Sequence, residues 1–264
     1  MSVLSCIGVG NMGAAILRSV VSAGLFPASA LVLCDAIEEK CLPFVAQGAT
    51  YTKDAAEAVR RADILLVAVK PQNLADLGAA VGSLTAGKLV ISICAGVTLG
   101  RLAELFPVAH LVRVMPNTPL MVGAGVSGLA FGADVTDAEK ETAQKIFAAG
   151  GLGFELPEEK MNALTAITSS SIAYFAQMIE QMTAWAVANG FDEAEASAWI
   201  TQAAAGTCAI LQKTEHTPTS LRIAVTSPHG TTEAALNVMR NEDIEGTLDR
   251  ALDACRDRAA ELGK

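Results

Sequence analysis

Short apolar runs alternate with longer segments of helical pattern through the first half of the chain. Buried parallel strands read as continuous apolar runs, and helices join such strands by right-handed crossovers. The alternation therefore predicts a parallel sheet built from βαβ units. The predicted strands are residues 3–7, 31–34, 64–69, 89–93 and 111–114, the predicted helices are residues 11–23, 37–46, 54–61, 73–81 and 98–106, and two further runs at 126–131 and 153–156, on either side of a helix at 137–149, are expected to extend the sheet edge.

The strand pattern ends near residue 156, and the rest of the chain has a helical pattern. Residues 159–189 favour a helix that ends at Gly190, and Asp192 is expected to cap a second helix towards Gln212. Residues 163–188 have few polar breaks, so we expect this surface to be buried against another subunit. After a turn-rich stretch, further helices are expected at residues 221–225, 231–240 and 243–262.

Composition and charge exclude several classes of protein. The 264 residues are 52% hydrophobic and 18% charged, which favours a folded chain with a sizeable core. With 19 Lys and Arg against 28 Asp and Glu the net charge is −9, so we expect no nucleic-acid partner. The longest uncharged stretches, residues 114–133 and 161–179, are broken by proline, glycine or polar residues, so we expect no membrane association.

The cysteines and the start of the chain indicate a cellular compartment. Six cysteines are scattered without CxxC spacing or neighbouring histidine pairs, which argues against a metal site. No charged segment precedes the first apolar run, so a signal peptide is not expected. The sequence therefore predicts a reduced, cytoplasmic protein.

A glycine-rich loop directly follows the first predicted strand and opens the first predicted helix. Its residues are Gly8, Val9, Gly10, Asn11, Met12 and Gly13. Glycines at these three positions allow a tight turn, backbone approach to a pyrophosphate and close helix packing, with the helix N-terminus facing the phosphate charge. An ordinary glycine-rich turn is the alternative. The sequence thus predicts an α/β fold, with a Rossmann-type doubly wound dinucleotide-binding domain over residues 1–156 and an all-helical dimerisation and substrate domain over residues 157–264.

Asp35 closes the second predicted strand, about 20 residues beyond the glycine loop. A carboxylate at this position accepts hydrogen bonds from an adenosine ribose and repels a 2′-phosphate, and no arginine follows at once. NADH is therefore favoured over NADPH. A helix cap for residues 37–46 is an alternative that is compatible with the ribose role.

Three further turns follow strand ends and are expected to converge at the ligand crevice of a doubly wound sheet. Lys70 in the first of them is a candidate catalytic residue, with a solvated surface lysine as the alternative. The prolines are also explained as loop stiffeners. The expected cofactor contacts in these turns are Ala68, Val69, Lys70, Pro71, Cys94, Ala95, Gly96 and, within residues 114–119, Asn117.

Residues 225–232 form a turn that leads into a predicted helix. Backbone N–H groups and hydroxyls at a helix start make a natural carboxylate site, which would suit a small acidic substrate. Taken alone, this segment is better explained by plain helix capping through its serines and threonines.

The ordered set of motifs, at residues 8–13, 68–71, 94–96, 115–119 and 225–232, resembles the pyrroline-5-carboxylate reductases. The resemblance implies a Rossmann domain followed by an intertwined helical dimerisation domain, within a homodimer or a ring of dimers, and reduction of a cyclic imine carboxylate to L-proline with NAD(P)H. It implies that Thr232 hydrogen-bonds the ring nitrogen and that the amides of Gly230 and Thr231 hold the substrate carboxylate. Glu215 matches a glutamate at the substrate side of the interface, although a solvated turn residue is the plainer interpretation.

Several positions depart from the family pattern. Residues 169–174 read Ser-Ser-Ser-Ile-Ala-Tyr where the family usually has Gly-Ser-Gly-Pro-Ala-Tyr, which suggests that a helix kink is lost. Ser170 and Tyr174 keep the family residues near the dimer core. Two family asparagines near the ligands appear as Ala55 and Ala224.

His229 replaces a small residue of the substrate loop, and an anion site there is expected only if its φ stays negative. A protonated imine is already electrophilic, so orientation and exclusion of water would supply most of the rate, with Thr232 as an orienting partner. His229 is then either a proton donor or carboxylate partner, or an exposed loop residue. Two other functions stay open: a reductase of another small imine or keto acid, and a catalytically silent dinucleotide-binding protein.

Overall fold

The computed structural model describes residues 2–262, and one eight-stranded sheet forms its N-terminal unit. The strand order is β3-β2-β1-β4-β5-β6-β7-β8, and every neighbouring pair is parallel except β6 and β7. This order confirms the predicted doubly wound sheet, with its switch point between β1 and β4. The strands are β1 (Leu4–Ile7), β2 (Leu31–Cys34), β3 (Thr50–Thr52), β4 (Ile64–Val67), β5 (Leu89–Ser92), β6 (His110–Pro116), β7 (Gly125–Phe131) and β8 (Gly151–Glu155).

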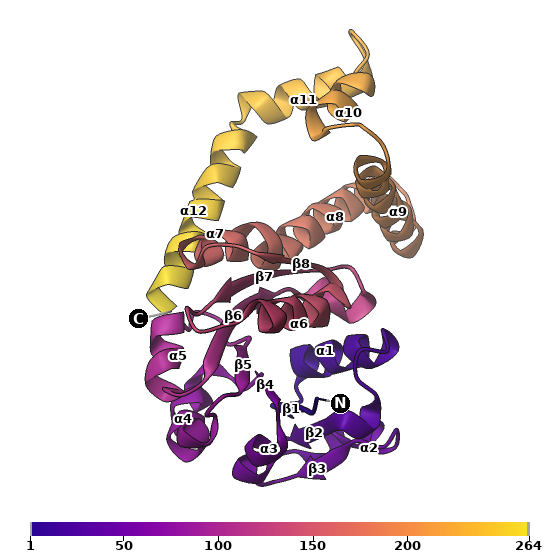
Figure 1. Ribbon diagram of the computed structural model, residues 1–264. Coiled ribbons are helices and arrows are strands. Elements are labelled where there is room, and N and C mark those ends of the chain that lie inside the picture. The colour runs from indigo at the N-terminus through magenta and orange to yellow at the C-terminus, as the bar shows by residue number, and fades with distance from the viewer. Residues whose placement is uncertain (1, 263–264) are drawn as a thin grey trace. The chain divides into compact units, whose positions relative to one another are not determined.

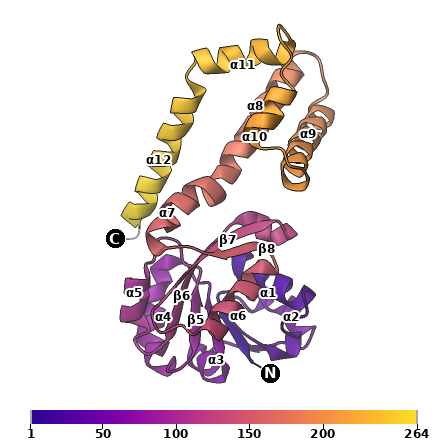
Figure 2. The ribbon, with the colours of Figure 1, turned by 45° about the horizontal axis from the view of Figure 1, so that its top comes forward.

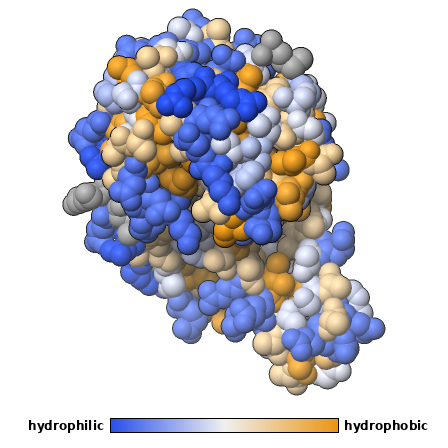
Figure 3. All heavy atoms as spheres, turned by 90° about the horizontal axis from the view of Figure 1, so that it is seen from below, coloured by the Kyte–Doolittle hydropathy of each residue, from blue (hydrophilic) through white to orange (hydrophobic). Residues whose placement is uncertain are grey.

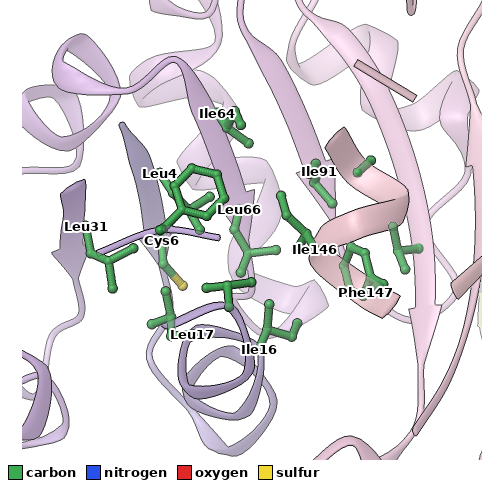
Figure 4. Close-up of a cluster of buried hydrophobic side chains, with 14 of the residues drawn as sticks. Leu4, Cys6, Ile16, Leu17, Leu31, Ile64, Leu66, Ile91, Ile146 and Phe147 are labelled. Carbon is green, nitrogen blue, oxygen red and sulfur yellow. The ribbon is translucent and has the colours of Figure 1, made fainter. Parts of the chain in front are cut away.

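Helices cover both faces of the sheet (Figure 1). On one face, α1 (Asn11–Ser22) and α6 (Asp137–Ala148) pack against the sheet through a buried apolar cluster. Figure 4 shows this cluster, in which Ile16 and Leu17 of α1 and Phe147 of α6 meet side chains from the central strands. A second cluster joins the opposite face to α3 (Ala55–Arg61), α4 (Leu74–Val81) and α5 (Leu99–Leu105).

Two predictions for this unit are wrong. The edge strand β3 is short and polar, with two threonines, so its apolar pattern is too weak to identify. The helix expected at residues 37–46 is instead a 3₁₀ turn, Glu38–Lys40, followed by the single-turn helix α2 (Leu42–Val45). Pro43 explains the interruption, because proline lacks an N–H donor and its ring clashes with the carbonyl four residues earlier.

The C-terminal half is helical, as predicted. Thr165–Ser170 is a π-helical segment, so regular α-helical bonding is interrupted in this region even though Ile172 stands where the family has proline. Asp192 caps its helix as expected, accepting a hydrogen bond from the Glu195 amide at 3.1 Å. The elements, visible in Figure 2, are η6 (Glu158–Lys160), α7 (Met161–Leu164), α8 (Ser171–Ala188), α9 (Glu193–Lys213), α10 (Pro218–Ala224), α11 (Thr231–Asn241) and α12 (Ile244–Leu262).

The chain forms two compact units, one of residues 170–254 and the other of the described residues before and after them. Helix α7 and the π-helical segment up to residue 169 therefore belong to the unit that contains the sheet. The predicted boundary between residues 156 and 157 lies just after the last strand, β8. That it separates two domains stays a prediction.

Large apolar side chains are exposed on the helical unit. Phe175 and Trp185 of α8 are 68% exposed, and Trp199 of α9 is 55% exposed. By contrast, Figure 3 shows hydrophilic residues surrounding smaller hydrophobic patches on the face that it displays. Among residues 2–262, no helix combines the length and the apolar character needed to cross a bilayer. The exposed aromatic side chains agree with a helical surface that is buried against a second subunit.

Candidate functional site

The glycine loop lies at the carboxyl ends of β1 and β4. Gly8 has a φ of +97°, and a Cβ built there would lie 2.5 Å from the Ala68 carbonyl oxygen. A Cβ at Gly13 would collide with the carbonyl oxygen of Gly8. Any larger side chain at either position would push the loop away from β4 or from α1, so these two glycines hold the loop against the sheet.

Gly10 has a different task. A Cβ at this position would meet no protein atom within 4 Å, although the residue is the N-cap of α1. No side chain of the described chain caps this helix start, and its first turn contains no acidic residue. The first amides of α1 therefore border open space, which is the arrangement that holds a pyrophosphate. The residues present fit a dinucleotide.

Asp35 links the glycine loop to the end of β2. Its Oδ2 atom accepts a hydrogen bond from the Val9 amide at 2.7 Å, and its Oδ1 atom accepts one from the Ile37 amide at 2.9 Å. The Lys40 Nζ atom lies 3.4 Å from Oδ1, and the Asp35 side chain is only 10% exposed. Sequence reasoning missed Lys40; a basic side chain five residues beyond the acidic position is the signal that was available.

The turns after β4 and β5 contact each other. The Cys94 thiol donates to the Val69 carbonyl oxygen at 3.3 Å. Gly96, with a φ of +78°, closes a turn in which the Val97 amide donates to the Cys94 carbonyl at 3.3 Å. Burial raises the pKa of the Cys94 thiol, and this effect is larger than the lowering caused by its hydrogen bond with Ser92. The thiol therefore stays protonated near neutral pH and can donate to the Val69 carbonyl.

Lys70 and Asn117 occupy different environments at the same sheet edge. Lys70 is exposed at the start of the 3₁₀ turn Pro71–Asn73. Asn117 is buried, donates from Nδ2 to the Thr168 carbonyl at 2.9 Å and accepts at Oδ1 from the Val126 amide at 2.7 Å. Asn117 thus ties β6 to β7 and to the π-helical segment, and its contact with a cofactor stays a prediction.

The predicted substrate loop leads into α11 in the helical unit. Gly230 is the N-cap and has no side-chain cap, but its amide donates to the Ser227 carbonyl at 3.0 Å. Of the two predicted carboxylate donors, the Thr231 amide is therefore the one left at the helix start. Thr232 lines a pocket of about 400 Å³ together with Val225. Glu215 is exposed between α9 and α10.

His229 does not adopt the backbone conformation that was expected. Its φ is +60°, in the left-handed region that residues other than glycine occupy rarely, although Asn, Asp and His do so more often than the rest. Its amide donates to the Glu233 Oε2 atom at 2.8 Å, and its side chain is exposed. The negative φ that was set as a condition for a backbone anion site at this position is therefore not met at His229. Sequence reasoning also missed Glu233, whose position three residues after the N-cap is typical of a helix start.

The predicted residues thus form two groups. Residues 8–13, Asp35, 68–71, 94–96 and Asn117 lie at the carboxyl edge of adjacent strands in the sheet unit. Residues 230–232 lie together in the helical unit. Among the described residues, no group of three His, Cys, Asp or Glu side chains is placed to hold a metal ion.

Comparisons with known proteins agree with this arrangement. A family model described as pyrroline-5-carboxylate reductase dimerisation matches residues 158–262, and one described as NADP oxidoreductase, coenzyme F420-dependent, matches residues 4–96. A pyrroline-5-carboxylate reductase of Methanosarcina acetivorans is 34% identical, over 98% of this chain and 97% of the relative.

Two solved structures share the whole fold. The pyrroline-5-carboxylate reductase of Coxiella burnetii has a TM-score of 0.93 at 29% identity, and the match covers 100% of this chain and 99% of that one. The pyrroline carboxylate reductase of Plasmodium falciparum, solved with NADP bound, has a TM-score of 0.89 at 26% identity, covering 100% and 98%.

Proposed function

The chain belongs to the pyrroline-5-carboxylate reductase family, and from this we propose that it reduces 1-pyrroline-5-carboxylate to L-proline. It is an NAD(P)H-dependent oxidoreductase that acts on a C=N bond. The structural observation that carries the proposal is the open start of α1 behind Gly10, which gives the dinucleotide a binding site in front of the strand ends.

Three groups of residues have separate tasks in this reaction. The amides that open α1 hold the pyrophosphate, and the turns of residues 68–71 and 94–96 border the nicotinamide. When bound, the reduced cofactor supplies a hydride to the imine carbon. The start of α11 holds the substrate carboxylate, mainly through the Thr231 amide, and the Thr232 hydroxyl accepts a hydrogen bond from the protonated ring nitrogen. Because the iminium carbon is already electrophilic, orientation and exclusion of water account for most of the acceleration.

The activity is tested by following nicotinamide absorbance with pyrroline-5-carboxylate and purified protein. We expect turnover, and we expect Thr232→Val to lower kcat/KM by about tenfold, the effect of one lost hydrogen bond to a charged group. Thr142→Val is the matched control, because the Thr142 hydroxyl donates to the Ala138 carbonyl within α6, outside the substrate loop. Cofactor binding without turnover on any cyclic imine would contradict the proposed activity.

We further propose that NADH is preferred over NADPH. The Asp35 carboxylate at the end of β2 supports this, because it would accept from the ribose hydroxyls and repel a 2′-phosphate. Lys40 works in the opposite direction, since its ammonium group lies beside that carboxylate. We expect Lys40→Ala to weaken the binding of NADPH more than the binding of NADH. We expect Asp35→Ser to reduce the difference in affinity between the two cofactors. A wild-type kcat/KM that is higher with NADPH would overturn the preference.

The assembly is a homodimer formed through the helical domain, and its substrate is a small molecule. We propose that dimers associate into a ring and that the protein works in the cytoplasm. Light scattering after size-exclusion chromatography would test the ring; a mass of two chains at all concentrations would contradict it.

A second candidate function rests on His229. A bulky residue in the left-handed turn beside the α11 start changes the outline of the carboxylate site relative to a family loop with glycine. This observation favours another small cyclic imine or keto acid as substrate. A kcat/KM for such a compound above that for pyrroline-5-carboxylate would support it.

A further inference from the structure

One carboxylate oxygen joins three elements beside the predicted nicotinamide turn. The Glu158 Oε1 atom accepts a hydrogen bond from the Leu99 amide at 2.7 Å and one from the Arg113 Nη1 atom at 2.9 Å. Leu99 is the first residue of α5, Arg113 lies in β6, and Glu158 opens η6. These contacts link segments far apart in the sequence, and all three belong to the sheet unit.

The Leu99 amide is the downstream end of the turn that contains residues 94–96. At its upstream end, the turn is held by a hydrogen bond from the Cys94 thiol to the Val69 carbonyl oxygen. Downstream, Thr98 caps α5 by accepting from the Arg101 amide at 3.1 Å, which satisfies a different donor. The first amide of α5 therefore depends on Glu158, and a carboxylate at a helix start is favoured further by the helix dipole. Both ends of the turn are fixed by side chains, and Glu158 supplies one of them.

Arg113 determines where the Glu158 carboxylate points. The Arg113 side chain is 9% exposed, while that of Glu158 is 31% exposed. A buried guanidinium without a partner is costly, so the ion pair forms wherever the fold allows it. Next to this pair, Met161 and Leu164 of α7 pack on Ala130 of β7 with Leu99 at their edge. The apolar contacts and the ion pair together keep the Oε1 atom in front of the Leu99 amide.

We propose that Glu158 is a positioning residue for the nicotinamide side of the cofactor site, acting through the Leu99 amide on the turn of residues 94–96, with Arg113 orienting its carboxylate. The proposal rests on the proposed function, which places that turn beside the cofactor. The Leu99 bond also satisfies an otherwise orphan amide at the start of α5, so the test must separate stability from cofactor binding.

The test separates the hydrogen bond from the ion pair. In an Arg113→Met background, which removes the buried charge, Glu158→Gln keeps an oxygen acceptor for the Leu99 amide and Glu158→Leu removes it. The measurements on the intact dimer are the dissociation constant for NADH from fluorescence titration, the melting temperature, and kcat and KM. Glu159→Gln, at the exposed neighbouring position, is the control and should match wild type.

We expect the Leu variant to melt at a somewhat lower temperature than the Gln variant, because the Leu99 amide loses its acceptor, so the NADH titrations are made well below both melting temperatures. The Leu variant should bind NADH on the order of tenfold more weakly than the Gln variant, because a turn that shifts by less than 1 Å misplaces the nicotinamide. Equal NADH affinities in the two would overturn the proposal and leave a purely structural ion pair. The titration needs no substrate, so a wild-type protein that binds NADH without reducing pyrroline-5-carboxylate would contradict the proposed function and leave this inference intact.

Discussion

Helices α1 and α11 begin in the same way, in two different parts of the molecule. Each follows a glycine N-cap without a side-chain cap. In each, a carboxylate takes the amide just before that glycine: Asp35 accepts from Val9 at 2.7 Å, and Glu233 accepts from His229 at 2.8 Å. The carboxylate near α1 comes from another strand, whereas the one at α11 comes from the helix itself. The first start is held by the core of the sheet, and the second is held by local bonds.

A third helix start shows what a purely structural terminus looks like. At α6, Thr136 accepts from the Glu139 amide while the Glu139 carboxylate accepts from the Thr136 amide, which forms a complete capping box. Its end amides are satisfied by its own side chains. Unlike α6, helices α1 and α11 have no side-chain cap at their starts, which agrees with the ligand sites proposed there.

The largest effect is expected where the core holds the loop. Gly8→Ala places a Cβ 2.5 Å from the Ala68 carbonyl at a φ of +97°. We expect the free energy of unfolding to fall by about 3 kcal/mol or more in urea titrations, since a clash adds to the backbone strain. Gly24→Ala is the control, because Gly24 has a φ of +69° with nothing within 4 Å, and should lose only about 1 kcal/mol. Equal losses in the two would show that β4 does not hold the loop.

The next effect separates binding from stability at the same helix start. Gly10→Ala adds a Cβ where no protein atom lies within 4 Å. The melting temperature should stay close to that of wild type, while the dissociation constant for NADH rises on the order of tenfold because the methyl group takes the place of a phosphate. Gly100→Ala in α5 is the control; it should leave the NADH dissociation constant unchanged and keep or slightly raise the melting temperature, because alanine favours a helix more than glycine does. An unchanged NADH affinity in Gly10→Ala would show that the pyrophosphate does not bind at the start of α1.

The difference between these regions also explains which features were predictable from sequence. The sheet unit follows from apolar runs and from glycines with a specific steric task, so strand order and the residues at its carboxyl edge were predictable. The failures involve tertiary or local competition. Pro43 breaks a helix that the pattern favoured, and the polar strand β3 is formed by its pairing with β2, which its own sequence pattern does not reveal. Lys40, Glu158 and Glu233 act through contacts that spacing alone does not specify.

His229 separates backbone strain from side-chain chemistry at α11. His229→Gly should raise the free energy of unfolding by up to about 1 kcal/mol, because glycine adopts a φ of +60° without strain and this gain exceeds its entropic cost. His229→Ala keeps the strain and should bring no gain. Both variants should keep turnover and the wild-type pH profile. Loss of turnover with an altered profile in both would instead identify the imidazole as a proton donor.

The smallest effect is expected at α6, whose start is closed by its own capping box. Desolvation raises the pKa of Glu139, but hydrogen bonds with Thr136 and His110 outweigh it and hold the pKa below its ordinary value of 4.5. A lowered pKa in the folded state means that the ionised carboxylate stabilises the fold above pH 4.5 and that this contribution is lost as the pH falls through the lower value. Glu139→Gln should therefore cost about 0.5 to 1 kcal/mol at pH 7, with a smaller difference from wild type in acid, and leave NADH affinity unchanged. If the variant and wild type differ in free energy of unfolding by the same amount at pH 7 and at pH 3, the charge of Glu139 does not contribute to the cap. Weaker NADH binding by the variant would mean that α6 supports the cofactor site, as is proposed for α1.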